Sequence, residues 1–197
     1  MKRASFLWLG RSLAVIAAAL STACGDNTPV SPNGRAASGV PAVADITDGN
    51  RLPVLPAGCE KVATDPGSTL VLKAFGVGVQ IYTWDGATWT GPVPRATLYA
   101  DATLHGIVAT HFEGPRWKSN SGGVVKGTAI EKCTPDAASI PWVKLAATPD
   151  GAGLFQDVAF IQRLTTVGGN PPSTNGTVVG QIAESPYTAD YLFYKAP

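Results

Sequence analysis

Hydrophobic residues recur at alternate positions along much of the chain, most clearly in two segments, residues 140–147 and 154–164. In the second segment successive side chains fall on two faces with a period near two rather than about 3.6. Pro149, Asp150 and Gly151 between the segments favour a tight turn. The pattern predicts two strands joined as a hairpin.

Further short apolar segments alternate with turn signals along the rest of the chain. The 22 Gly and 16 Pro divide the chain into many short elements and disfavour long helices. The other expected strands are residues 68–75, 79–84, 87–90, 96–99, 107–112, 124–130 and 187–194, with Asp85-Gly86 as the clearest hairpin turn. About eight or nine strands without an internal repeat predict an all-β domain over residues 51–197, either an antiparallel β-sandwich or a small β-barrel.

The first residues have the features of an export signal. Basic residues at positions 2, 3 and 11 precede the apolar run 13–20, and small residues then lead to Cys24. The run is too short to cross ~30 Å of hydrocarbon as a helix. Cys24 resembles the acylated cysteine of a bacterial lipobox, so residues 1–23 are predicted to be a lipoprotein signal peptide. An ordinary secretory signal is the alternative.

The residues after Cys24 are expected to be a flexible tether. Residues 24–50 are rich in Pro, Ser, Asn and Gly and show no period, a composition that a frayed terminus would share. The expected partner of this part is the membrane, through the lipid on Cys24. The resemblance to bacterial lipoproteins implies that Gly25, rather than Asp, after the cysteine fits transport to the outer membrane, where the domain would face the periplasm or the cell surface.

The charge balance gives no basic surface for nucleic acid. The 15 Lys and Arg nearly equal the 14 Asp and Glu, and removal of the signal makes the chain slightly acidic. Gly76-Val-Gly78 could suggest a nucleotide site, but these glycines lead into a strand, whereas a phosphate cradle opens a helix. We therefore expect neither a nucleotide nor another cofactor.

The remaining cysteines predict a disulfide. If Cys24 carries lipid, Cys59 and Cys133 are left as a pair in an oxidising compartment. A metal site would need more neighbouring ligands than these cysteines and the two histidines supply, so no metal is expected.

Several motifs resemble the family catalogued as domain of unknown function 3455 (DUF3455). They are Gly78-Val-Gln-Ile-Tyr82, Thr110-His111 with Gly114-Pro115 and Trp117, Ile140-Pro141-Trp142, Gly151-Ala-Gly-Leu-Phe155, Ile161-Gln162-Arg163 with Gly168-Gly169, and Pro186-Tyr-Thr-Ala-Asp-Tyr-Leu-Phe-Tyr194. The resemblance covers about residues 52–194. It implies an exported domain of this fold but no activity.

His111 is the candidate for catalysis. On a strand, Glu113 would share its face, and a histidine beside a carboxylate can act as a general base or as a metal ligand. His105 has the same parity but falls in an expected turn. A hydrolytic or metal-dependent enzyme using His111 with Glu113 is therefore the alternative to a non-enzymatic binding or structural module, and a structural histidine is the favoured interpretation of His111.

Arg163 and Asp190 are the charged residues in otherwise apolar strands. A buried charge needs a partner, so they are expected either to meet each other or a nearby partner within the fold, which is favoured, or to face a pocket.

Aromatic residues offer a second candidate site. Trp84 and Trp89 flank the Asp85-Gly86 turn, and a ring exposed there could stack on an envelope glycan. Together with Trp117 they form the predicted ligand-binding set. Packing in the core is the alternative role for all of these rings.

Overall fold

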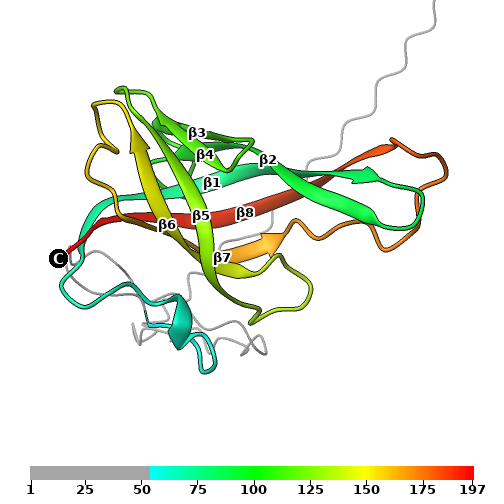
Figure 1. Ribbon diagram of the computed structural model, residues 1–197, viewed down its shortest axis with the longest axis horizontal. Helices are drawn as coiled ribbons and strands as arrows, with labels where there is room; N and C mark the ends of the chain where they lie inside the picture. The colour runs from blue at the N-terminus through cyan, green and yellow to red at the C-terminus, as the bar shows by residue number, and fades with distance from the viewer. Residues whose placement is uncertain (1–53) are drawn as a thin grey trace, which may run out of the picture. The chain divides into compact units, whose positions relative to one another are not determined.

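The computed structural model describes residues 54–197, which form one closed sheet of eight antiparallel strands (Figure 1). The strands are β1 (Thr69–Trp84), β2 (Trp89–Tyr99), β3 (Ile107–Phe112), β4 (Arg116–Ser119), β5 (Val124–Cys133), β6 (Trp142–Asp150), β7 (Phe160–Gly168) and β8 (Ile182–Lys195), preceded by the short 3-10 helix η1 (Glu60–Val62). Each strand pairs with the next, and β8 pairs with β1. The all-β prediction is confirmed, and of its two forms the structure is the barrel.

The predicted signal peptide 1–23, the lipidation site Cys24 and the tether 24–50 lie outside the described residues. In the part that is described, no helix has the length and apolarity needed to cross a membrane.

The longest pair of strands, β1 and β8, extends past the barrel. Together with the first half of β2 it forms an arm (Figure 1). The arm ends in the predicted β1–β2 turn, where the Asp85 carboxylate accepts hydrogen bonds from the backbone N–H groups of Ala87 and Thr88, 2.8 Å each. The loop has four residues rather than two, so β2 begins at Trp89.

The barrel interior is packed with alternate side chains from every strand, as a pleated sheet requires. Aromatic rings dominate this core, among them Trp117, Tyr191 and Phe193. Gly76 makes room for one of them, because a Cβ there would lie 2.6 Å from the Tyr191 ring. The predicted strands 68–75 and 79–84 are therefore one strand: Gly76 and Gly78 lie inside β1, where they serve close packing, and do not separate two strands.

One outer face of the barrel is covered by the segment before β1, residues 54–68, which we call the cover. Cys59 in this segment is bonded to Cys133 at the end of β5, which confirms the predicted disulfide. Around it, Val62 and Leu192 are fully buried in a second apolar cluster. The Gln162 side chain, also buried, donates to the Val62 carbonyl over 2.7 Å. Both faces of β7 are thus buried, the inner one in the barrel and the outer one under this cover.

The predicted hairpin around residues 140–164 exists, but its turn is wrong. Pro149 and Asp150 belong to β6, where they pair with β5. Residues 151–159 form the connection instead. It places Phe155 against the end of the barrel core, stacked on Phe193 with 4.7 Å between ring centroids. Burial of this ring is the physical reason why residues 154–159 leave the strand.

Candidate functional site

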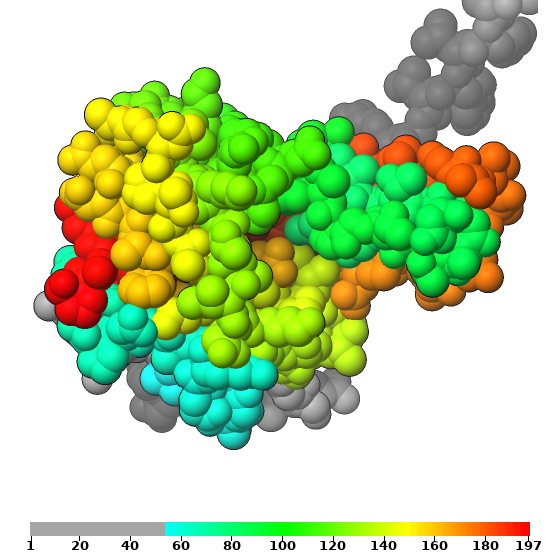
Figure 2. Space-filling model, in the orientation of Figure 1, coloured from blue at the N-terminus to red at the C-terminus, as the bar shows by residue number. Residues whose placement is uncertain are grey.

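A cavity of about 400 Å³ opens into the barrel interior where the arm leaves the barrel. Every strand contributes to its wall: Gln80 of β1, Pro92, Val93 and Pro94 of β2, His111 of β3, Trp117 of β4, Ala129 of β5, Val143 and Leu145 of β6, Arg163 of β7 and Tyr191 of β8. Glu113, Gly114 and Pro115 of the β3–β4 turn complete it. Figure 2 shows a hollow on this face between β2 and β5, with red atoms of β8 at its floor.

His111 lies on the wall of this cavity as a neutral, fixed ring. It faces Trp117 across the β3–β4 pair, and the two rings stack with 4.2 Å between centroids. Its Nδ1 lies 2.9 Å from the Arg116 carbonyl oxygen. Because a carbonyl can only accept, Nδ1 carries the proton. Burial lowers the pKa of His111 to about 3, against the smaller opposing effect of that hydrogen bond. At neutral pH, Nε2 therefore carries a lone pair.

Arg163 brings a positive charge to the interior. It pairs with Tyr191 in the β7–β8 register, on the inward side. Its Nη2 donates to the Pro141 carbonyl over 2.9 Å, while its Nε has no partner. Among residues 54–197 no carboxylate lies within 4.0 Å of this guanidinium.

Arg163 and Asp190 therefore do not pair with each other, and the internal partner of Arg163 is the neutral Pro141 carbonyl. The register pairs Leu164 with Asp190, so Asp190 has the parity opposite to Arg163 and the two point to opposite faces of the sheet. Asp190 accepts a hydrogen bond of 2.7 Å from the Thr165 hydroxyl instead. The alternative prediction, that the charge faces a pocket, describes Arg163.

The buried polar groups of this cavity are mostly donors. Gln80 and Trp117 are each 1% exposed, and neither Nε2 of Gln80 nor Nε1 of Trp117 has a hydrogen-bond partner. The Tyr191 and Tyr187 hydroxyls bond each other over 2.9 Å. Burial raises the pKa of both phenols, so they stay neutral. The site therefore joins an apolar, aromatic wall to N–H groups that lack acceptors.

The structure does not assemble the predicted catalytic group. β3 ends at Phe112, so Glu113 lies in an exposed turn at the mouth rather than on the strand face of His111. The proton on Nδ1 of His111 is held by a backbone carbonyl, not by Glu113. His105 lies in an exposed loop, where its Nδ1 is 2.7 Å from the Thr103 hydroxyl. No group of three or more His, Cys, Asp or Glu suited to a metal occurs in the described part of the chain.

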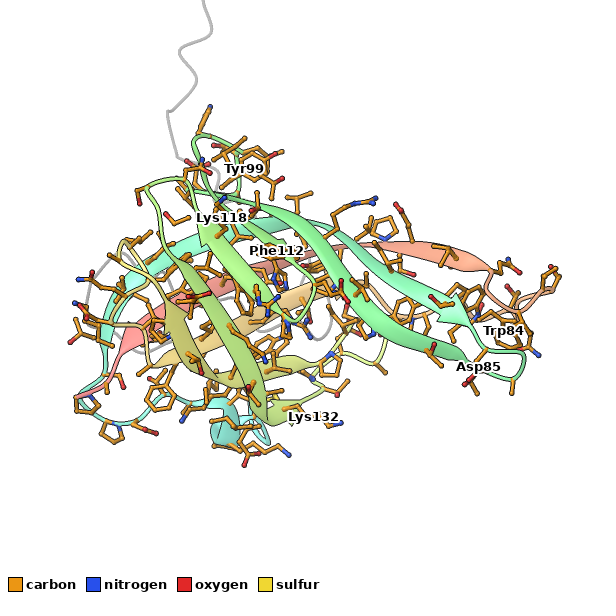
Figure 3. All side chains as sticks on the ribbon, turned by 45° about the horizontal axis from the view of Figure 1, so that its top comes forward. Trp84, Asp85, Tyr99, Phe112, Lys118 and Lys132 are labelled. Carbon is orange, nitrogen blue, oxygen red and sulfur yellow. A yellow bond between two sulfur atoms is a disulfide. The ribbon has the colours of Figure 1, made fainter. Side chains whose placement is uncertain are left out.

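The expected exposure of the arm tryptophans is wrong for Trp84. Trp84 lies at the end of the arm beside Asp85 (Figure 3), yet only 5% of it is exposed. It packs edge-on against Trp89 with 5.4 Å between centroids, and the loop around Gly176 covers it. Trp89 is half-buried, and its Nε1 donates to the Thr174 carbonyl over 2.9 Å. These rings form no open stacking platform, whereas Trp117 lines the cavity.

Sequence reasoning missed Gln80 and Tyr191 as site residues. A signal for Gln80 was present, since it shares its parity in β1 with Tyr82 and Trp84 and is the polar member of an otherwise aromatic face. Tyr191 carries no such signal, because one tyrosine among the several aromatic residues of β8 is indistinguishable from core.

The comparison with protein families agrees with the motifs. The model of the family described as "Protein of unknown function (DUF3455)" matches residues 65–195, which include all eight strands. Neither the curated proteins nor the solved structures gave a match.

Proposed function

Since this chain belongs to the DUF3455 family of proteins of unknown function, we propose its role from the barrel itself: it binds a small, largely apolar molecule in the interior cavity. The observation that carries the proposal is a cavity of about 400 Å³ to which all eight strands contribute. Small-molecule sites are concave, mostly apolar and lined by a few placed polar groups, with volumes from about 300 Å³ upward. The interior of a small barrel is a common place for them.

The wall is organised before any ligand binds. The closed sheet removes free edges, and the His111–Trp117 stack and the Tyr187–Tyr191 hydrogen bond hold the rings in one arrangement. A preorganised wall lowers the entropy that binding must overcome. The enzyme alternative has less support, because His111 is oriented by a carbonyl and Glu113 does not bond to it.

We further propose that this binding domain works in the cell envelope, attached to a membrane through lipid on Cys24. The first support is the sequence: the apolar run and small residues that precede Cys24, and the Pro- and Ser-rich residues that follow. The Cys59–Cys133 disulfide fits an oxidising compartment. Labelled palmitate fed to expressing cells should enter the protein and not its Cys24→Ala variant; an unlabelled protein would contradict the anchor.

Ala129→Trp tests the cavity directly. Ala129 lines the mouth and is exposed, so the larger ring should fill the opening without burying new surface in the core. We expect the affinity for the neutral probe 2-naphthamide to fall at least about tenfold, equivalent to about 1.4 kcal/mol. The measurement is equilibrium dialysis of the purified full chain, with the same detergent on both sides of the membrane.

Thr128→Trp is the matched control. Thr128 is the exposed neighbour of Ala129 on β5 and does not line the cavity. It should leave the affinity for 2-naphthamide within about twofold, since the added ring lies outside. Equal binding by both variants and the unchanged protein would exclude the cavity as the site, and absence of binding by the unchanged protein would refute the proposal for ligands of this size.

A further inference from the structure

We infer that Arg163 anchors a carboxylate of the bound molecule, so that the ligand is a small apolar acid; this inference rests on the proposed function. Arg163 is held on the inward side of β7, and its guanidinium brings a positive charge with five N–H donors and no acceptor. Within residues 54–197 the groups that face its guanidinium are neutral: the Pro141 carbonyl, which accepts a hydrogen bond over 2.9 Å, and the Tyr191 phenol. A partly buried cation with no counter-charge is costly, and an anion supplied by a ligand removes that cost.

No other group inside the cavity supplies the missing negative charge. His111, Tyr187 and Tyr191 all lie near enough to feel the charge of Arg163, and all three are neutral at neutral pH. The carboxylate among the lining residues is that of Glu113, in the exposed turn at the mouth, where water screens it. The net charge deep in the cavity is therefore that of Arg163.

The orphaned polar atoms point to the same class of ligand. Of the lining residues, Gln80, Trp117 and Arg163 each have a buried side-chain nitrogen without a partner, and every one of these atoms is an N–H donor. Donors without acceptors favour a ligand that offers only acceptors, as a carboxylate does. Each nitrogen has less than 1 Å² exposed, so an amide or guanidinium rotation must accompany binding, a change of the size that side chains commonly make.

The shape of the proposed acid follows from the Arg163 guanidinium and from the apolar wall of the cavity. A guanidinium presents its donors as a planar fork that matches a planar carboxylate. The rest of the wall is apolar or aromatic, including Trp117, Leu145 and Pro115. A flat hydrocarbon body carrying one carboxylate satisfies both parts.

The test compares 2-naphthoate with 2-naphthamide, which has the same rings but no charge. In equilibrium dialysis of the full chain we expect the unchanged protein to bind 2-naphthoate about ten- to a hundredfold more tightly, the range for a hydrogen bond to a charged group. Arg163→Gln should remove this preference by weakening 2-naphthoate, while the affinity for 2-naphthamide stays within about threefold. Lys118→Gln, which removes a positive charge from an exposed position on β4 that does not line the cavity, should keep the preference.

Arg163→Lys guards against misfolding of Arg163→Gln. It keeps the charge but loses the fork, and it should retain a reduced preference for 2-naphthoate. Equal affinity of the unchanged protein for both probes, or a preference that survives in Arg163→Gln, overturns the anchor. If 2-naphthamide still binds and Ala129→Trp still blocks it, the proposed function stands without the anchor; if neither probe binds, both fail.

Discussion

Replacement of Cys59 and Cys133 by Ser should lower the free energy of unfolding by about 4 kcal/mol. The bond closes a loop over a sequence separation of 74, and the chain-entropy model gives about this value for a loop of that size. The effect reaches further than the bond, because the same cover shields the outer face of β7, where Gln162 and Leu164 are buried. Urea unfolding followed by tryptophan fluorescence measures the change.

Reductant provides the control for this prediction. The unchanged protein should fall to the stability of the Cys59→Ser, Cys133→Ser variant when the disulfide is reduced, while the variant itself should not respond. A variant as stable as the oxidised protein would mean that the packing of η1 and its neighbours holds the cover without the bond.

Lowering the pH from 7 to 4 should remove about 3 kcal/mol of stability through His111 alone. Burial holds its folded pKa at about 3, against 6.5 for an ordinary histidine. Between these values the unfolded chain binds a proton that the folded chain does not, so stability falls by about 1.4 kcal/mol for each pH unit below 6.5. The loss continues until the pH reaches about 3. Unfolding by urea at a series of pH values gives the slope.

His111→Asn isolates this contribution. Its curve of unfolding free energy against pH should be flatter by nearly one proton between pH 6 and 4, whatever the stack on Trp117 costs at neutral pH. His105→Asn is the matched control, because the His105 side chain is 80% exposed, and its curve should follow that of the unchanged protein. Exposed carboxylates such as Asp85, whose pKa is lowered by backbone hydrogen bonds, also make stability depend on pH. Their contribution is the same in the unchanged protein and in both variants. Parallel curves for all three proteins would contradict the buried, neutral assignment of His111.

Much of the fold could be predicted because successive side chains of a strand point to opposite faces of the sheet, so buried and exposed residues alternate in the sequence. Phe160, Gln162 and Leu164 do share a face, and Ile161 and Arg163 share the other. The pattern does not say which face is inward when both are buried, as they are in β7. Which face of β7 is the outer one is decided by the cover before β1, which packs on that face. No local sequence pattern predicts where the cover packs.

The wrong predictions for Trp84 and for the turn at Pro149 have one cause: contacts with residues distant in the sequence outweigh the local signal. Trp84 flanks a turn and was expected to be exposed, but a loop about 90 positions further along the chain folds over it. Pro149 and Asp150 have the composition of a turn, but the pairing with β5 and the burial of Phe155 outweigh it.

The cavity itself could not be predicted from the sequence, although single residues of its wall could. The cavity takes one to three residues from each strand, and only the register brings Gln80, Trp117 and Arg163 to one space. Arg163 was recognisable as a charge needing a partner; whether that partner is Asp190 or a ligand depends on the strand register, which one sequence does not fix.

The link between Cys59 and Cys133 also decides where mechanical load enters the domain. Tension on the chain ahead of Cys59 is shared between the sulfur bridge to the end of β5 and the segment that leads into β1. The seam between β1 and β8, which each contribute a residue to the cavity wall, thereby carries less of the load. A barrel loaded by a pull on the chain ahead of Cys59 would better keep its opening unchanged.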